Sequence, residues 1–272
     1  MQHFSISPKA IITSLWSHRS LWIALTKREV VGRYRGSVLG ILWSFFNPVF
    51  MLAVYTFVFS VIFQARWSSG SESKTEFALV LFAGMIVFGL FSECVNRAPG
   101  LILSNVNYVK KVVFPLEILP FVSLGAAAFH LLVSAAVWLI FYIIFFGAPH
   151  LTILLLPPVL LPLALFTLGV AWMLASLGVY LRDVGQIVGI LTTALLFLSP
   201  IFYPVTALPA EYQSLMHINP LTPVIEQTRQ VLVWGKVPDI KLWFFSMILG
   251  LAVAWLGFAW FQKTRKGFAD VL

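Results

Sequence analysis

Five stretches of this chain contain no Asp, Glu, Lys or Arg, and they limit the possible folds more than any other feature. The stretches are residues 36–65, 77–92, 118–181, 184–210 and 242–262. A helix needs about 20 apolar residues to cross a bilayer, so most of these stretches can cross one. The stretch 118–181 is too long for one crossing, and the turn-forming run Gly147-Ala148-Pro149-His150 divides it into two helices. The sequence therefore predicts six membrane spans.

The pattern within the stretches indicates helices. Strands of a membrane barrel alternate over about ten residues, whereas these stretches are continuously apolar. Only 10% of the residues are charged, against roughly 25% in a soluble domain. We therefore expect an all-α membrane protein with six transmembrane helices, built as one domain over residues 1–272. The expected spans are about 38–63, 77–97, 118–146, 151–181, 184–203 and 240–262.

The basic residues indicate the orientation of the chain. With a cytoplasmic N-terminus, six Lys or Arg precede the first span, three follow the second, one follows the fourth and three follow the sixth. Only five of the 18 then lie on the opposite side. The positive-inside rule therefore places both termini in the cytoplasm. The net charge of +8 does not indicate nucleic-acid binding, because these residues sit at membrane boundaries beside lipid headgroups.

Two segments outside the spans have patterns of their own. Residues 6–35 mix apolar and basic side chains, which suits an amphipathic helix in the membrane interface, although a positively charged anchor is an equal alternative. Gly32, Gly36 and Gly40 then permit a sharp bend or close helix packing. The run 199–204 contains two prolines and ends the fifth apolar stretch. We interpret residues 204–238 as re-entrant or interfacial half-helices on the outer side.

The sequence lacks the usual signatures of catalysis. There is no phosphate-binding loop, no nucleophile elbow and no His-Glu-x-x-His pair, so ATP hydrolysis belongs to another polypeptide. The single cysteine, Cys94, provides neither a disulfide nor a thiolate metal site within one chain. His130 lies inside a predicted span, where we favour a neutral hydrogen-bonded packing role over a proton relay, since no intramembrane carboxylate is near it in sequence.

Aromatic residues are abundant, and several share one face of the first span. Trp43, Phe46, Phe50 and Phe57 are spaced by three, four and seven residues. Contact with lipid is the default interpretation of such a face. The alternative is a path for sugars, which stack on aromatic rings, and the sequence leaves the choice open.

Several short motifs, in order along nearly the whole chain, resemble one family. They lie at 27–29, 33–40, 43–48, 107–120, 180–184, 199–204, 219–223 and 268–272, and include Arg33-Tyr34-Arg35-Gly36-Ser37, Phe114-Pro115-Leu116-Glu117 and Asn219-Pro220-Leu221-Thr222-Pro223. Together they resemble the ABC type 2 permeases that export polysaccharides.

The resemblance implies the permease subunit of an O-antigen, capsular polysaccharide or teichoic acid exporter in a bacterial inner membrane. Two copies of the chain would pair with two copies of a cytoplasmic ATPase, which binds ATP and Mg, while this chain holds no cofactor or metal. The substrate would be a lipid-linked polysaccharide, most readily O-antigen, moved along a pathway at the dimer interface. The implied pathway residues are Trp43, Phe46, Tyr55, Phe202 and Tyr203. The implied ATPase-coupling residues are Lys27, Arg28, Arg33, Arg35, Asn107, Tyr108, Lys110, Lys111, Glu117, Arg182 and Asp183.

Two other classes of function stay open at this point. One is a type 2 permease for a small drug or lipid, although such relatives commonly insert a larger outer domain. The other is a membrane scaffold or an embedded enzyme of glycan synthesis without ATP coupling. An enzyme requires carboxylates arranged for acid–base work, whereas Glu93, Glu117 and Asp183 all sit at predicted cytoplasmic boundaries.

Overall fold

The computed structural model of the chain describes residues 5–62, 67, 74–110 and 114–272. Every regular element within these residues is a helix, which confirms the all-α prediction. Five helical segments are long and apolar enough to cross a membrane: Gly40–Phe59, Thr75–Gly100, Leu116–Phe146, Leu151–Tyr180 and Ile240–Val271. The remaining predicted span corresponds to α8 (Val184–Leu198), whose 15 residues fall short of the approximately 20 that a crossing needs.

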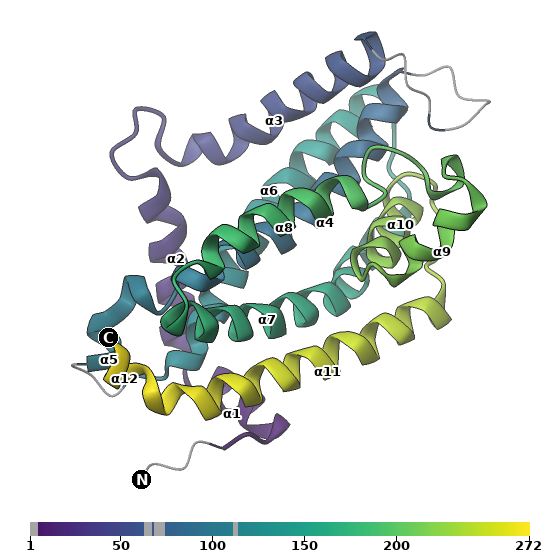
Figure 1. Cartoon of the computed structure of the whole chain (residues 1–272). Coiled ribbons are helices and arrows are strands. Elements are labelled where there is room, and N and C mark those ends of the chain that lie inside the picture. Colours follow the sequence, from purple (N-terminus) through teal and green to yellow (C-terminus); the bar gives the residue numbers. More distant parts are fainter. Residues whose placement is uncertain (1–4, 63–66, 68–73, 111–113) are drawn as a thin grey trace.

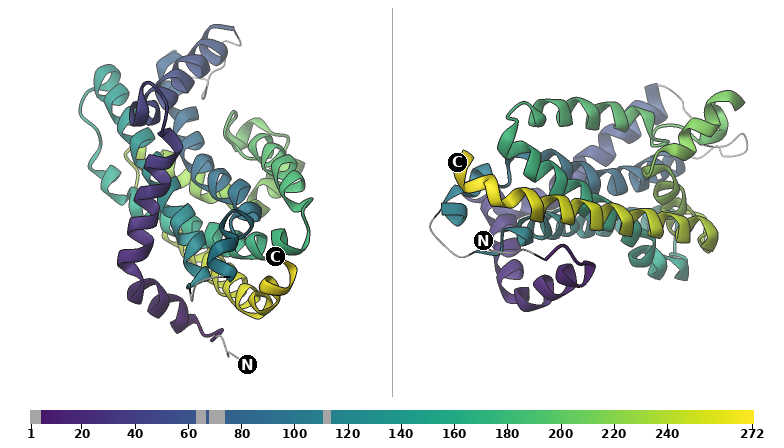
Figure 2. Two further views of the ribbon diagram at one scale, coloured as in Figure 1. Left: turned by 90° about the vertical axis from the view of Figure 1, so that its left-hand side faces the viewer. Right: turned by 60° about the horizontal axis from the view of Figure 1, so that its bottom comes forward.

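The N-terminal segment forms an arm along the outside of the bundle (Figure 2). It consists of α1 (Pro8–Ser17) and α2 (Arg19–Tyr34). Leu25 of α2 is buried against Ile118 and Val122, where α2 packs on α6. The arm ends in the predicted bend, where the backbone takes a positive φ at Gly36 (87°) and Gly40 (53°). Glycine adopts this conformation without steric cost.

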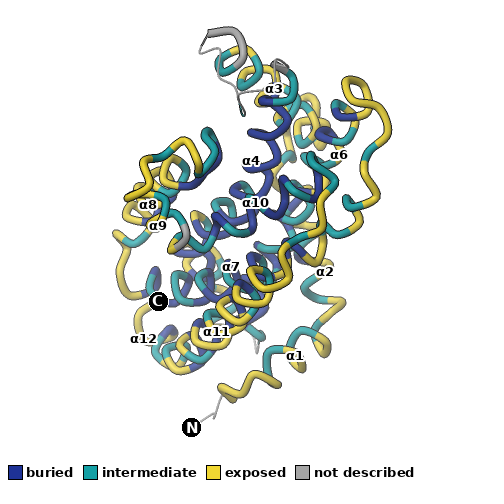
Figure 3. Tube along the Cα trace, turned by 90° about the vertical axis from the view of Figure 1, so that its right-hand side faces the viewer, coloured by how far each residue is buried: buried dark blue, intermediate teal, exposed yellow. Residues whose placement is uncertain are grey.

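The long helices pack around a central one. They are α3 (Trp43–Tyr55), α4 (Lys74–Arg97), α6 (Leu119–Phe146), α7 (Leu156–Tyr180), α8 and α11 (Ile240–Thr264). Helix α3 follows η1 (Gly40–Leu42) and continues as the π-helical η2 (Thr56–Ile62). Helix α4 contacts α3, α6, α7 and α8, and Figure 3 shows it buried within the bundle. The hydrophobic core therefore forms around α4, while α3, α8 and α11 keep large apolar side chains on the outside.

Helices α7 and α11 approach closely through glycines. A Cβ atom added at Gly257 would lie 2.1 Å from the carbonyl oxygen of Gly169, and one at Gly169 would lie 2.3 Å from that of Val253. Small residues permit this backbone contact between membrane helices. The pair thus forms a rigid unit on one side of the bundle.

Short helices gather at the two ends of the bundle (Figure 1). One end, which we call the α5 end, carries η3 (Ala98–Gly100), η4 (Leu103–Asn105), α5 (Val106–Lys110), η5 (Leu116–Ile118), η8 (Arg265–Gly267) and α12 (Phe268–Val271). The other, the α9 end, carries η6 (Leu151–Leu155), η7 (Val205–Ala207), α9 (Ala210–Ile218) and α10 (Leu221–Leu232). The predicted turn after α6 is present at Gly147, whose φ is 82°.

Candidate functional site

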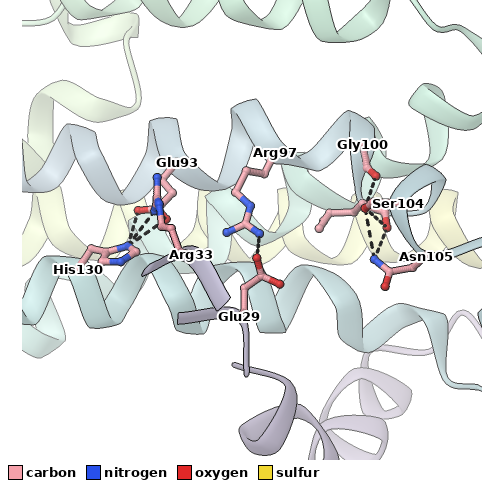
Figure 4. Close-up of polar contacts among 9 residues, drawn as sticks. Glu29, Arg33, Glu93, Arg97, Gly100, Ser104, Asn105 and His130 are labelled. Carbon is pink, nitrogen blue, oxygen red and sulfur yellow. Dashed lines mark hydrogen bonds and ion pairs between the residues drawn. The ribbon is translucent and has the colours of Figure 1, made fainter. Parts of the chain in front are cut away.

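A cluster of polar side chains lies between the N-terminal arm and the bundle (Figure 4). It contains Arg33 and Tyr34 at the end of α2, Glu93 on α4 and His130 on α6. Arg33 forms an ion pair with Glu93. His130 Nδ1 lies 2.9 Å from Glu93 Oε2, and its Nε2 lies 3.0 Å from the Tyr34 hydroxyl. The cluster therefore links three helices that are far apart in sequence.

The hydrogen bonds assign a proton to one nitrogen of His130. A carboxylate only accepts hydrogen bonds, so Nδ1–H donates to Glu93. In a neutral ring the Nε2 lone pair then accepts the hydroxyl hydrogen of Tyr34. Burial raises the pKa of Tyr34 above its ordinary value, an effect that Arg33 opposes and Glu93 adds to. The phenol therefore keeps the hydrogen that it donates. The side chains of Glu93 and His130 are only 16% and 17% exposed, so the contact between them is largely screened from solvent, whereas the Arg33 side chain is 49% exposed.

The sequence did not identify this cluster. It favoured a hydrogen-bonded role for His130, and the side chain is hydrogen-bonded. However, the absence of a nearby carboxylate in sequence was misleading, because Glu93 contacts the ring from 37 residues away. Arg33, which was predicted to couple to an ATPase, forms an ion pair with Glu93 in this cluster. The available signal was the rarity of ionisable groups within membrane helices.

Other predicted coupling residues do come together at the α5 end. Arg28 Nη2 donates to the Tyr108 hydroxyl at 3.0 Å, and the Tyr108 ring stacks on Phe114 with centroids 4.3 Å apart. The Lys110 ammonium donates to the backbone carbonyl of Leu272, next to α12. Helix α5 is therefore tied both to α2 and to the last residues of the chain. Lys111 lies outside the described residues.

Glu117 is the most connected of the predicted coupling residues. Its carboxylate accepts hydrogen bonds from Ser14 of α1 at 3.0 Å and from Arg265 of η8 at 2.6 Å. Its backbone carbonyl accepts one from Trp172 Nε1 of α7, also at 3.0 Å. Arg265 donates a further bond to the Phe114 carbonyl. One buried acidic residue of η5 thus joins α1 of the arm, α7, and η8, which directly follows α11.

The remaining coupling residues are exposed around the same end. Lys27 lies on α2, Arg35 is the C-cap residue of that helix, and Asn107 lies on α5. Arg182 and Asp183 form the exposed turn between α7 and α8. A second ion pair, Glu29 with Arg97, joins α2 to the end of α4 (Figure 4). The α5 end therefore presents charged groups on a framework that its own ion pairs hold together.

The predicted pathway residues fall into two groups. Phe202 stacks on Phe59 and Phe197, with centroids 5.4 and 5.6 Å apart, and the Tyr203 hydroxyl donates to the Phe197 carbonyl at 2.8 Å. These contacts join the α9 ends of α3 and α8. Trp43 and Tyr55 line hollows beside α3. Phe46 packs against Phe45 and Phe50 instead.

The α9 end is held together by an arginine that was not predicted from the sequence. Arg229 of α10 is fully buried and donates to the carbonyls of Val80, Pro200 and Ile201 at 3.1, 2.5 and 2.8 Å. It also pairs with Glu226 at 2.8 Å. Its guanidinium lies 4.2 Å from the centre of the Trp67 ring. The broken segment after α8 is therefore fixed to both α4 and α10.

These features define a class of protein. The helices are long and apolar enough to span a membrane. Charged residues gather at the α5 end, and Arg229 holds the segment after α8 at the α9 end, an arrangement that indicates a membrane-embedded protein. The described residues contain no group of three or more metal-binding side chains. The chain belongs to the ABC-2 type transporter family, which matches residues 20–233. It is thus the membrane subunit of a transporter.

Individual relatives cover almost the full length. The chain is 28% identical to the O-antigen export system permease protein RfbA of Myxococcus xanthus over 96% of this chain and 98% of that protein. It is 24% identical to the RfbA permease of Klebsiella pneumoniae, over 93% and 95%. The polysialic acid transport protein KpsM of Escherichia coli is 26% identical, over 89% and 92%.

Proposed function

We propose that this chain is the membrane-spanning permease of an ATP-driven exporter. The exporter moves lipid-linked polysaccharide, specifically O-antigen, across the bacterial inner membrane. The observation that carries the proposal is the end-to-end similarity to O-antigen export permeases, which includes the arm, the α5 end and the α9 end. Relatives named for capsule or polysialic acid export support the same class of cargo.

In this proposal the α5 end faces the cytoplasm. The distribution of basic residues supports this orientation, since 13 of the 18 Lys and Arg belong to segments on that side. The arm and α12 lie at or near the same end (Figure 1), which supports a cytoplasmic location for both in this proposal. The α9 end then faces outward, where α9 and α10 cover the end of the bundle.

The partner that supplies energy is a cytoplasmic ATPase, which binds ATP and Mg and is present in two copies. Helix α5 and the turn at Arg182 and Asp183 are the exposed elements that such a partner reaches first. A displacement of α5 reaches α2 through Arg28 and Tyr108. It also reaches η8 through the Tyr108 ring, which stacks on Phe114, because Arg265 donates to the Phe114 carbonyl. Packed elements with fixed contacts transmit such motion as a shift between discrete arrangements.

A second copy of the chain completes the pathway. Exposed apolar side chains cover α3 and α8, among them Phe50, Phe57, Ile187 and Ile190, and large apolar faces of this kind mark contacts with lipid or protein. Pairing of two chains through α3 and α8 would enclose a path bordered by aromatic residues. Trp43, Phe46 and Tyr55 would border it along α3, and Phe202 and Tyr203 at its outer end.

The experiment is deletion of the gene, followed by quantification of lipid-linked polysaccharide on each side of the inner membrane. We expect the glycan to accumulate on the cytoplasmic side and to disappear from the surface, and the intact gene to reverse both effects. Unchanged surface glycan would contradict the proposal and favour export of a small drug or lipid.

A further inference from the structure

Four charged residues join the arm to the central helix α4 (Figure 4). Glu29 and Arg33 belong to α2, and Glu93 and Arg97 belong to α4. Arg33 pairs with Glu93, and Arg97 pairs with Glu29. The two helices therefore run in opposite directions along this contact, and each presents one acidic and one basic residue to the other. We call this arrangement the charge clasp.

The same four residues can also pair within their own helices. Glu29 precedes Arg33 by four residues in α2, and Glu93 precedes Arg97 by four residues in α4. Residues four apart are neighbours on a helix surface, and an acidic residue placed N-terminal to a basic one is the favourable order. If the arm separated from α4, each helix would close its own ion pair. Two arrangements of the clasp thus leave no charge without a partner.

Complete pairing matters because Glu93 and Arg97 lie in a segment that is apolar enough to cross a membrane. Charged groups at such positions are costly unless they are paired. The Glu93 side chain is 16% exposed, and that of Arg97 is 32% exposed. Glu93 also keeps its contact with His130 in either arrangement, since α4 and α6 pack directly on each other. An exchange of partners therefore costs less than a simple separation, as a two-state element requires.

The packing around the clasp permits the end of α2 to move. On the N-terminal side of the clasp, α2 is seated closely on α6, where a Cβ atom added at Gly125 would lie 2.9 Å from the Thr26 side chain. On its C-terminal side, the bend at residues 36–40 contains two glycines with positive φ angles and separates α2 from α3. Tyr34 adds one hydrogen bond to His130, which would open with the clasp. The clasp thus lies between a close contact and a permissive bend.

The clasp adjoins the contact that ties the arm to α5. Arg28, which donates to the Tyr108 hydroxyl, is the residue directly before Glu29. A displacement of α5 that moves Arg28 therefore acts on the neighbouring residue of the clasp. The other half of the clasp belongs to α4, which contacts α3, α6, α7 and α8. The clasp is thus the point at which motion of the arm either reaches the core of the bundle or is disconnected from it.

We propose that the charge clasp is a switch that holds the arm on α4 in the absence of nucleotide and releases it when the ATPase binds ATP. Release converts the two ion pairs between the helices into one pair within each helix. Glu29, Glu93 and Arg97 then act in coupling beside Arg33. The inference rests on the proposed export function, because it specifies how motion of the ATPase changes the contact between the arm and the core.

An exchange of one pair distinguishes a switch from a fixed brace. Glu29→Arg combined with Arg97→Glu restores attraction between the helices, but it places like charges four residues apart in both α2 and α4. The clasped arrangement stays available, whereas the released one is disfavoured. We expect this double variant to assemble normally with the ATPase and to export glycan at least about ten-fold more slowly than the native chain, a difference of ~1.4 kcal/mol.

Glu29→Gln combined with Arg97→Gln is the matched control, because the same two positions lose their charge without creating repulsion. This variant should export glycan faster than the exchanged variant. A fixed brace predicts the opposite order, since only the exchanged variant keeps both ion pairs between the helices. Export by the exchanged variant that equals the native rate, or that is at least as fast as export by the glutamine variant, would overturn the proposal.

A crosslinking measurement follows the arm directly and does not depend on the cargo. Glu29→Cys and Arg97→Cys are introduced together with Cys94→Ala, since Cys94 is the single cysteine of the chain. A bismaleimide with a short spacer joins the two new thiols while the arm lies on α4, and mass spectrometry quantifies the product within one chain. In the complex with the ATPase in lipid nanodiscs, a non-hydrolysable ATP analogue should lower the yield at least about three-fold. An unchanged or higher yield would overturn the proposal.

The switch and the export function fail separately. Crosslinking that falls with nucleotide, in a chain whose deletion leaves surface glycan unchanged, would support the switch and contradict the export function. Loss of surface glycan on deletion, together with crosslinking that does not respond to nucleotide, would support the export function and refute the switch.

Discussion

Replacing Arg229 by alanine tests how the outer end of the bundle is held together. The side chain is fully buried and is the shared donor to Val80 on α4 and to Pro200 and Ile201 in the segment after α8. Alanine would remove these hydrogen bonds and the pairing with Glu226. The contact with the Trp67 ring would also be lost. We expect α4, α10 and the broken segment to separate at lower temperature than in the native chain.

The size of the effect follows from the groups left without a donor. An unsatisfied buried acceptor costs about 1–3 kcal/mol, and removing one partner of a buried ion pair costs about 3–5 kcal/mol. Glu226 is 30% exposed and regains water, and the carbonyls relax in part, so we expect a total of about 3–5 kcal/mol. At roughly 2–4 °C per kcal/mol for a chain of somewhat smaller size, the unfolding temperature should fall by about 6–20 °C.

The assay is thermal unfolding of the purified protein in detergent, followed by its tryptophan fluorescence. Arg182→Ala is the matched control, because Arg182 is exposed and surface substitutions usually change stability by about 0.5 kcal/mol or less. Arg229→Lys should recover only part of the loss, since an ammonium keeps the charge but lacks the planar guanidinium fork. If Arg229→Ala and Arg182→Ala unfold at the same temperature, the reasoning is wrong.

Three further predictions concern other parts of the chain. Gly257→Ala should destabilise the α7–α11 pair by about 1–3 kcal/mol, because the added methyl meets the Gly169 carbonyl; Gly89→Ala meets nothing within 4 Å and should be neutral in the same unfolding assay. Reversing the charges of Lys110 and Lys111 to Glu should weaken binding of the ATPase about ten-fold, or ~1.4 kcal/mol; ATPase activity that the permease still stimulates normally would count against a coupling role for this segment. Tyr203→Ala should slow glycan export about ten-fold with assembly intact. Tyr203→Phe is the control that keeps the aromatic ring. If the alanine variant exports glycan as fast as the native chain, Tyr203 is not part of the pathway.

Much of the fold was predictable because its determinants are local. A long run without charged residues is stable in a bilayer whatever it contacts, so the apolar stretches indicate helices directly. The breaks are equally local: Gly36, Gly40 and Gly147 have positive φ angles, and the Ser199-Pro200 pair ends α8 at Leu198. The predicted bend and turn are present for this reason. The shortness of α8 was less evident, because its apolar pattern continues past its last helical residue.

The sequence motifs indicated which end of the bundle carries many of the polar residues, but not which side chains meet there. Glu117 contacts Arg265 across 148 residues and Arg28 contacts Tyr108 across 80, and neither pair was predicted. Arg33 belongs to the same run of basic residues as Arg28, yet it faces Glu93 instead. Five residues of helix α2, about one and a half turns, separate the two environments, and nothing in the basic pattern distinguishes them.

The sequence by itself therefore determined the class of fold and most of the helical segments with their breaks, and it predicted an orientation. Tertiary structure alone decided which polar groups meet inside the membrane. Glu93 finds His130 across 37 residues, and Arg229 reaches Val80 across 149. Helices such as α6 and α7 are apolar on nearly every side, so periodicity does not reveal which face turns inward. Their rotation is set by close packing against neighbours, and only that packing brings the few polar side chains together.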